Sequence, residues 1–245
     1  TKGVADRLEQ LPMKRTEHGV WVAEKQGDLN GTYYTYEVKV EQEIREACDP
    51  YARTTGVNGD RAMVLNLAST DPEGWEKDKN PHAGEEVTDA VIYELHVRDL
   101  SMDESAGIKH AGKFLGLTET GTKTAHGVAT GLDHMKDLGI THLHLLPFYD
   151  YGSVDETKLD KPQFNWGYDP INYNVPEGSY ATDPYHGEVR VKELKQTIQA
   201  LHENGISVVM DVVYNHTYSS YSSPFQLSVP AYYYRMHDNG SFQDG

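Results

Sequence analysis

The pattern of hydrophobic positions changes near residue 90. Before that point, short β-branched and aromatic stretches alternate partly with polar residues, and no helical period persists. The clearest stretch is TYYTYEVKV at residues 32–40, and shorter ones occupy residues 19–23 and 61–67. Alternation of this kind predicts β-strands. Three strands are too few to close a sandwich, so residues 1–85 are expected to form a domain that is either small or truncated at its front.

After residue 90, helical and continuous apolar stretches take turns. Apolar residues recur at helical spacing in residues 127–138 and 191–201, and each predicted helix ends at a glycine, Gly139 or Gly205. Near-continuous apolar stretches, which predict buried strands, occupy residues 91–97, 140–146 and 206–213. Helix–glycine–strand units with such strands predict a parallel sheet covered by helices.

Long loops follow two of the predicted strands in this second part. They occupy residues 98–126 and 147–187. In parallel folds the loops at the carboxyl ends of the strands carry the functional sites. No Gly-rich dinucleotide or phosphate-loop motif follows any strand, so a Rossmann fold is excluded. The polar, Pro- and Gly-rich residues 69–88 are expected to link the two parts and to lie against the second.

Charge and composition narrow the classes of partner. The chain of 245 residues carries a net charge of −16, which disfavours binding to nucleic acid and to anionic membrane surfaces. No run of 18 apolar residues is present, so no membrane span is predicted. A single cysteine, Cys48, excludes an intramolecular disulfide framework and a cysteine-based zinc site. Seventeen tyrosines against five phenylalanines are typical either of ordinary packing or of surfaces that stack on sugar rings.

The first candidate site segment is QFNWGYDP at residues 163–170. Trp166 and Tyr168 would stack on a sugar ring, while Asn165 and Asp169 would bind its hydroxyl groups. The alternative is a rigid loop whose aromatic rings belong to the core.

The second candidate segment is DVVYNH at residues 211–216. A charged Asp211 at the end of so apolar a strand is costly unless it is paired, and Asn215 and His216 follow immediately. If the strand lines a barrel, these three groups lie where barrel sites are built. The alternative is a structural, paired Asp211 with a surface histidine.

Ionisable residues also alternate along two of the predicted strands. In residues 93–99 they predict a buried, satisfied polar cluster more readily than a site. His142 and His144 share one strand face, a spacing that suits a metal but more often reflects packing within a sheet.

These segments resemble the alpha-amylase superfamily, glycoside hydrolase family thirteen, and within it the type I pullulanases. DVVYNH is similar to the first conserved region of that family, and FNWGYDP at residues 164–170 to the pullulanase signature, with Phe164 in place of the leading tyrosine. VIYELHVRDLS and LLPFYDYGSVDE resemble the first two barrel strands, and NYNVPEGSYATDP continues the similarity. Residues 19–82 resemble the end of a family forty-eight carbohydrate-binding module. The resemblance implies an incomplete N-terminal β-sandwich over residues 1–85 and, over residues 86–245, the first three β/α units of a (β/α)8 barrel.

The resemblance also implies roles for individual residues. Tyr168 would stack beneath the sugar just before the scissile bond, and His216 would hydrogen-bond the same sugar. Asp211 would orient the arginine of the family's site, and Asn165 and Asp169 would border the subsite.

Asn215 is the one metal candidate that the resemblance implies. It stands where many relatives place a calcium ligand, so a structural calcium is expected there at most. No cofactor is expected to be required.

The catalytic carboxylates of the family are not expected in this chain. Retaining glycosidases use an Asp or Glu nucleophile and a carboxylic acid, which the family places after its fourth and fifth strands. No G-x-R-x-D segment occurs here, so both carboxylates are expected beyond Gly245, and the N-terminus, which lacks Met, is expected to be cut. The chain alone is therefore predicted to be inactive, with an α-glucan and the C-terminal remainder of the same enzyme as partners.

Three functions remain open. The implied one is hydrolysis of α-1,6-glucosidic bonds in pullulan and branched α-glucans by a retaining mechanism. The alternatives are a non-catalytic α-glucan-binding protein and an α-1,4-acting amylase or branching enzyme of the same superfamily.

Overall fold

A three-stranded parallel sheet forms the centre of the second part of the chain. In the computed structural model, which describes residues 9–243, this sheet consists of strands β7 (Ile92–Leu95), β8 (His142–Leu145) and β11 (Ser207–Met210). The strand order is β11-β8-β7, with His142 paired to both Ile92 and Ser207. The predicted parallel sheet is therefore confirmed, and the carboxyl ends of its strands meet at one edge.

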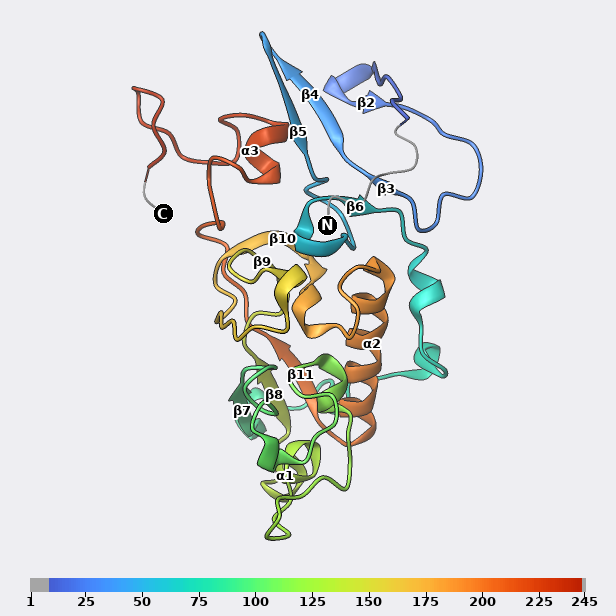
Figure 1. Cartoon of the computed structure of the whole chain (residues 1–245), viewed down its shortest axis with the longest axis vertical. Coiled ribbons are helices and arrows are strands. Elements are labelled where there is room, and N and C mark those ends of the chain that lie inside the picture. Colours follow the sequence, from blue (N-terminus) through green and yellow to red (C-terminus); the bar gives the residue numbers. More distant parts are fainter. Residues whose placement is uncertain (1–8, 244–245) are drawn as a thin grey trace.

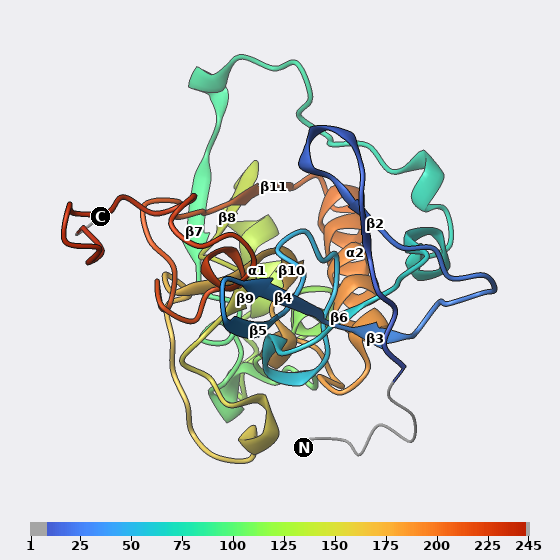
Figure 2. The same cartoon turned by 90° about the horizontal axis from the view of Figure 1, so that it is seen from above.

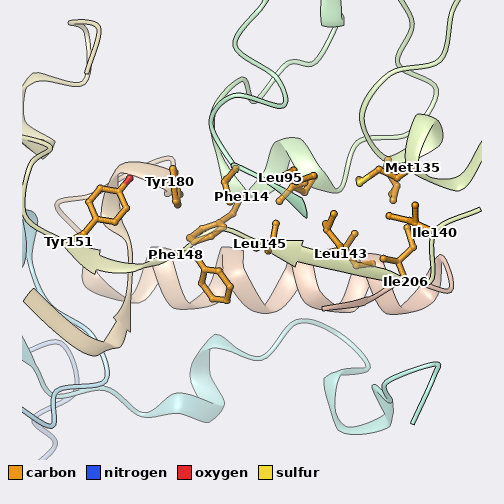
Figure 3. Packing of buried hydrophobic residues seen from close by; sticks show 14 of the residues in the cluster. Leu95, Phe114, Met135, Ile140, Leu143, Leu145, Phe148, Tyr151, Tyr180 and Ile206 are labelled. Carbon is orange, nitrogen blue, oxygen red and sulfur yellow. The ribbon is translucent and has the colours of Figure 1, made fainter. Parts of the chain in front are cut away.

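Two helices precede strands of this sheet and pack on it. Helix α1 (Gly131–Asp137) leads to β8, and helix α2 (Gly187–Glu203) leads to β11. Their apolar faces bury a continuous core that extends along α2 from Tyr151 and Tyr180 to Met135, Ile140 and Ile206 (Figure 3). The period of hydrophobic residues predicted α2 well, because Val191 and Leu201 are both buried.

The helix predicted over residues 127–138 begins later than expected. Val128, placed on its apolar face by the sequence pattern, is 61% exposed and precedes α1. Ala129 instead forms a β-bridge with Lys123, and the Thr130 hydroxyl donates to the carbonyl of Ala106. These loop contacts hold residues 127–130 in an extended turn, so the helix begins at Gly131.

Three separate antiparallel pairs make up the first part of the chain. They are β1 (Lys14–Arg15) with β2 (Trp21–Val22), β3 (Tyr33–Tyr34) with β6 (Ala62–Met63), and β4 (Tyr36–Val40) with β5 (Glu43–Ala47). The β-structure is as predicted, although β1 and β5 were not foreseen and residues 64–67 leave the predicted third strand. That these pairs form an incomplete β-sandwich stays a prediction.

Another pair and a short helix join the two parts. Strand β9 (Tyr149–Tyr151) pairs with β10 (Pro170–Pro176), with irregular register, and lies between the parallel sheet and the N-terminal pairs (Figure 1). Seen from above, β4 and β5 lie in front of this pair (Figure 2). Helix α3 (Pro224–Ser228) contacts β4 and β5. No helix among residues 9–243 combines the length and apolarity needed to cross a bilayer.

Residues 67–82 form a strap along helix α2, shown in turquoise beside that helix in Figure 1. Lys195 Nζ donates to the carbonyl of Leu67 at 2.8 Å, and Gln199 Nε2 donates to that of Glu73 at 2.9 Å. Farther along, His202 Nδ1 lies 2.8 Å from Asp78 Oδ2. The partners are separated by 124 to 128 residues throughout, so the strap follows the helix in the same direction. The prediction that this segment lies against the second part is confirmed.

A buried arginine fastens the first part of the chain to the second. Arg190 of α2 is fully buried, and its guanidinium lies 3.4 Å from Asp150 Oδ1 and 3.1 Å from Glu156 Oε2. It also donates to Thr55 Oγ1 and to the carbonyl of Gly56, both in the N-terminal part. Helix α2 therefore provides one charged side chain that both parts share.

The carboxylates around Arg190 outnumber it. Asp150, Glu156 and Glu177 are all buried, and single oxygens from the three lie within 4.8 Å of one another. Burial raises the pKa of Asp150 to about 7, although the charge of Arg190 acts in the opposite direction, and burial raises the pKa of Glu177 well above its usual value. The folded protein therefore holds a proton here that the unfolded chain releases at lower pH.

The raised pKa of Asp150 predicts a pH dependence of stability that Asp150→Asn should reduce. The unfolded chain loses the proton near the ordinary Asp pKa of about 4, whereas the folded protein keeps it up to about pH 7. The contribution of Asp150 to the free energy of unfolding therefore falls as the pH rises from about 4 to about 7. The fall is at most about 1.4 kcal/mol per pH unit. Urea unfolding at several pH values should show the variant gaining stability relative to the parent from pH 4 to pH 7. Asp137→Asn, at an exposed position, should follow the parent; a parallel course for Asp150→Asn would refute the assignment.

Candidate functional site

The loop formed by residues 164–169 braces itself internally. Asn165 Oδ1 accepts a hydrogen bond from the amide of Gly167 at 2.8 Å, and Asn165 Nδ2 donates to Asp169 Oδ1 at 2.7 Å. Gly167 has a φ of +91°, and a Cβ there would lie 2.5 Å from the carbonyl oxygen of Pro147. The turn therefore requires glycine and presses against the chain after strand β8. Asn165 and Asp169, both predicted site residues, shape the loop in this structure.

The loop brings Tyr168 to the carboxyl end of strand β11. The Tyr168 hydroxyl donates to Asp211 Oδ2 at 2.5 Å, and His216 Nε2 lies 2.6 Å from the Tyr168 carbonyl oxygen. A carbonyl oxygen only accepts, so Nε2 of His216 carries the proton and Nδ1 is left as an acceptor in the neutral ring. Asp211 and His216 follow Tyr168 by 43 and 48 residues in the sequence. Three predicted site residues that are distant along the chain therefore meet here.

Electrostatics explains why Tyr168 stays a hydrogen-bond donor. Desolvation and then the hydrogen bond to Asp211 raise the pKa of Tyr168 to about 12. At neutral pH the phenol therefore remains protonated and holds the carboxylate. Asp211 lies just beyond β11 with its side chain 21% exposed, which accords with the expectation that it is paired.

His144 adds a link that the sequence interpretation did not place in the site. Its Nε2 lies 3.6 Å from Asp211 Oδ2, and its Nδ1 lies 3.7 Å from Glu94 Oε2 on the neighbouring strand. Glu94, His144 and Asp211 thus form a row across all three parallel strands. The alternation of polar residues along β7 and β8 signalled this row, but nothing in the sequence showed which of them would face Asp211.

The two remaining aromatic residues of the loop differ from Tyr168. Phe164 stacks on His96 with ring centroids 5.2 Å apart, and Trp166 packs edge-on against Phe164 at 6.4 Å. His96 is buried and contacts the Asn165 carbonyl and the Tyr180 hydroxyl, as predicted. Glu94 and Asp99 are exposed, so the prediction that the ionisable residues of 93–99 form one buried cluster is wrong beyond His96. Trp166 is 62% exposed and contacts neither Tyr168 nor Asp211 in any recorded ring or hydrogen-bond interaction among the described residues.

Two further tyrosines support the segment after β11. The Tyr173 hydroxyl of β10 donates to the His216 carbonyl at 2.8 Å, and the Tyr149 hydroxyl accepts from the Val213 amide at 3.3 Å. Their rings contact each other at 5.7 Å. The sequence interpretation missed both, because the pairing of β9 with β10 depends on a long-range, irregular register.

Asn215, the residue predicted as a calcium ligand, is exposed, and calcium requires six to eight oxygen ligands. Within the part of the chain that the structure describes, the one group of three acidic, histidine or cysteine ligands is Asp150, Glu156 and Glu177, whose charge Arg190 partly neutralises. Calcium at Asn215 therefore stays a prediction.

The arrangement suits the binding and orientation of a polar ring. It offers an aromatic ring, a histidine with one free acceptor and an exposed tryptophan nearby. Two of its carboxylates accept hydrogen bonds within the site, Asp211 from Tyr168 and Asp169 from Asn165 and Ser153.

The sequence is similar to the alpha amylase catalytic domain and to pullulanases. A family model described as the alpha amylase catalytic domain matches residues 109–238. Pullulanase of Bacillus subtilis (strain 168) is 43% identical over 234 residues, covering 95% of this chain and 32% of that protein. Pullulanase 1, chloroplastic, of Arabidopsis thaliana is 36% identical over 280 residues, covering 97% of this chain and 28% of that protein.

Solved structures give the same result. A crystal structure of pullulanase from Paenibacillus barengoltzii, in complex with maltohexaose and alpha-cyclodextrin, superimposes with a TM-score of 0.91 at 55% identity. The match covers 95% of this chain and 36% of that one. This chain therefore spans about a third of the length of the relatives it matches.

Proposed function

The chain belongs to the alpha-amylase family, and from this membership we propose that it is part of a debranching glycoside hydrolase. The proposed enzyme cleaves α-1,6-glucosidic bonds in pullulan and branched α-glucans such as starch and glycogen. Pullulanases at 36% to 55% identity over nearly the whole chain support this proposal. The maltohexaose and cyclodextrin bound to one of these relatives support an α-glucan as the ligand.

We further propose how the chain contributes to the whole enzyme. Residues 1–85 would belong to a carbohydrate-binding β-sandwich, and residues 86–245 would supply the first three β/α units of a (β/α)8 barrel. The parallel order β11-β8-β7 with preceding helices supports this assignment. The site lies at the carboxyl ends of these strands, where barrel enzymes carry their chemistry.

The meeting of Tyr168, Asp211 and His216 is the observation that carries the proposal. Tyr168 would stack beneath the sugar before the scissile bond, and His216 would bind a hydroxyl of that sugar. Asp211 would hold Tyr168 and orient an arginine of the complete site. Asn165 and Asp169 would act by shaping the loop that presents Tyr168, and Trp166 would flank the bound glucan.

The bond-breaking groups would come from outside these 245 residues. A retaining mechanism needs a nucleophile and a general acid about 5–5.5 Å apart. Asp211 and Asp169 both accept hydrogen bonds within the site, which supports positioning roles for them. We propose that the remainder of the enzyme supplies both catalytic carboxylates. No cofactor is needed for this chemistry, and a structural calcium near Asn215 would be an addition to it.

The products formed from pullulan test the proposal against its rivals. The parent enzyme is incubated with pullulan, and the products are separated by chromatography. Cleavage of α-1,6 bonds releases maltotriose as the main product. Panose would indicate an α-1,4-acting enzyme, and binding without any product would indicate a non-catalytic α-glucan-binding protein.

Tyr168→Ala in the parent enzyme is expected to lower kcat/KM for pullulan by roughly 5- to 150-fold. The substitution removes an aromatic platform, whose loss typically costs on the order of 1–3 kcal/mol. Tyr168→Phe keeps the ring and loses only the hydrogen bond to Asp211, so it should retain more activity. Steady-state kinetics on pullulan measure both effects.

Tyr51→Ala provides the matched control for Tyr168→Ala. Tyr51 is 67% exposed, and its hydroxyl contacts only that of Tyr233, at 3.4 Å, among the recorded hydrogen bonds of the described residues. Its removal should leave kcat/KM within about twofold of the parent, since exposed substitutions change little. Equal losses at Tyr168 and Tyr51 would remove the basis for the stacking role.

A further inference from the structure

An open cavity lies behind the loop that presents Tyr168. It has a volume of about 240 Å³ and is bordered by the chain after β7, the segment from Tyr151 to Asn165, and the turn at Ser179 and Tyr180. Tyr168, Asp211 and His216 do not line it, and of the proposed glucan-site residues only Asn165 does. With a liquid volume of about 30 Å³ per water, the cavity has room for about eight waters.

Positive charge dominates the lining of this cavity. Arg98, Lys113 and Lys161 line it together with a single carboxylate, Asp160. The chain as a whole has the reverse balance, with 38 acidic against 22 basic side chains. Three cations and one carboxylate therefore line the cavity, a balance that favours an anion as its ligand.

These cations lack strong carboxylate partners within the described residues. Lys113 and Lys161 take part in no ion pair within 4.0 Å there, and Arg98 reaches only its neighbour Asp99, at 3.5 Å. Lys113 Nζ donates to the Ser179 carbonyl at 2.7 Å, which leaves two of its three donors for another acceptor.

Lys113 is also partly withdrawn from water. Desolvation lowers its pKa, and Glu193, Glu156 and Glu177 offset this only from beyond contact distance. A partly desolvated cation gains stability when an anion reaches it. An anion bound in the cavity would therefore stabilise the charged form of Lys113.

We propose that this cavity is a binding site for a phosphate group, either free phosphate or the phosphate monoester of a small sugar. Lys113, Arg98 and Lys161 would contact the phosphate oxygens, as cations commonly do. The hydroxyls of Tyr151 and Ser179, which lie 3.4 Å apart at the cavity wall, would face the sugar of a monoester. This site is separate from the proposed glucan site, so it can be tested independently of hydrolytic activity.

Isothermal titration calorimetry with inorganic phosphate, at constant ionic strength set by chloride, tests the proposal. The purified parent enzyme is expected to bind one phosphate at this site. Lys161→Met, at an exposed position that tolerates substitution, should weaken binding by roughly 10- to 150-fold, which is the effect of losing a hydrogen bond to a charged group. Lys113→Met should weaken it at least as much, and Lys113→Arg should recover part of the loss.

Two controls make the result specific to the cavity. Asp160→Asn removes the only lining carboxylate and should tighten binding by about two- to fivefold. Lys109→Met removes an exposed cation from the same loop that does not line the cavity, and should leave Kd unchanged. Circular dichroism melting curves without phosphate establish that each variant is folded.

A parallel titration with glucose 1-phosphate distinguishes the two sources of the phosphate group. Tighter binding than inorganic phosphate would identify a sugar phosphate as the ligand, and equal binding would identify phosphate alone. No heat with either probe, or the same Kd for Lys161→Met, Asp160→Asn and Lys109→Met, would overturn the proposal.

Discussion

The 245-residue chain, purified by itself, should leave pullulan uncleaved. A retaining glycosidase needs a nucleophile and an acid about 5–5.5 Å apart, and the proposed function assigns both carboxylates to the remainder of the enzyme. Enzymes accelerate their reactions by at least about a millionfold, so turnover should fall by at least that factor relative to the parent enzyme. Reducing ends released from pullulan, measured at equal molar concentrations, provide the comparison.

Complementation strengthens this test. The remainder of the parent enzyme, produced separately, should restore turnover when mixed with this chain, because the sheet edges at β7 and β11 are available for further strands. A version of the chain that carries Tyr168→Ala should restore less. Turnover by the chain alone, near the rate of the parent, would show that its own carboxylates suffice and would overturn the assigned roles.

Arg190→Met should destabilise the protein by about 3–5 kcal/mol, the typical cost of removing one partner from a buried charge network. The variant leaves Asp150 and Glu156 buried without their cation, and it removes the hydrogen bonds to Thr55 and to the Gly56 carbonyl. Because those last contacts connect the two parts of the chain, early cleavage near residue 56 in limited proteolysis should accompany the loss. Urea denaturation measures the change in the free energy of unfolding.

Arg53→Met provides the control for charge alone. Arg53 lies two residues from Thr55 but is exposed, so its substitution should change stability by no more than about 0.5 kcal/mol. A similar midpoint of urea denaturation for Arg190→Met and Arg53→Met would mean that the buried charge network contributes little to stability. Arg190→Lys keeps the charge but cannot reproduce the planar contacts to six acceptors, so it should restore only part of the stability.

The periodicity of hydrophobic residues predicted much of the fold. Val191 and Leu201 marked helix α2, and the apolar stretches marked the three parallel strands, because these elements bury their faces against one core. The pattern failed where tertiary contacts override it. Val128 fits a helical face but lies in a turn held by Thr130. The hydrophobic pattern also gave no sign of the completely buried charge of Arg190.

The site could be predicted where the motif residues are themselves in contact. Tyr168, Asp211 and His216 were expected together on the strength of the family resemblance, and the structure places them within hydrogen-bond distance. The position of His144 depends on how three strands align, and that of Tyr173 on an irregular pairing of β9 with β10. Neither alignment is encoded within a short segment. The predictions on the two chain ends concern residues 1–8 and 244–245, which lie outside the described residues.

The strap along helix α2 has a consequence for how the protein forms during translation. Its polar side chains and carbonyls find their partners about 125 residues later in the chain. At about 5–20 residues per second, a ribosome needs about 6 to 25 seconds to synthesise that distance. Throughout this interval residues 67–82 have been made but have nothing to lie against. Their many Asp, Glu, Lys and Asn side chains keep such a segment hydrated. The polarity of the strap thus leaves little apolar surface for other chains to bind before α2 emerges.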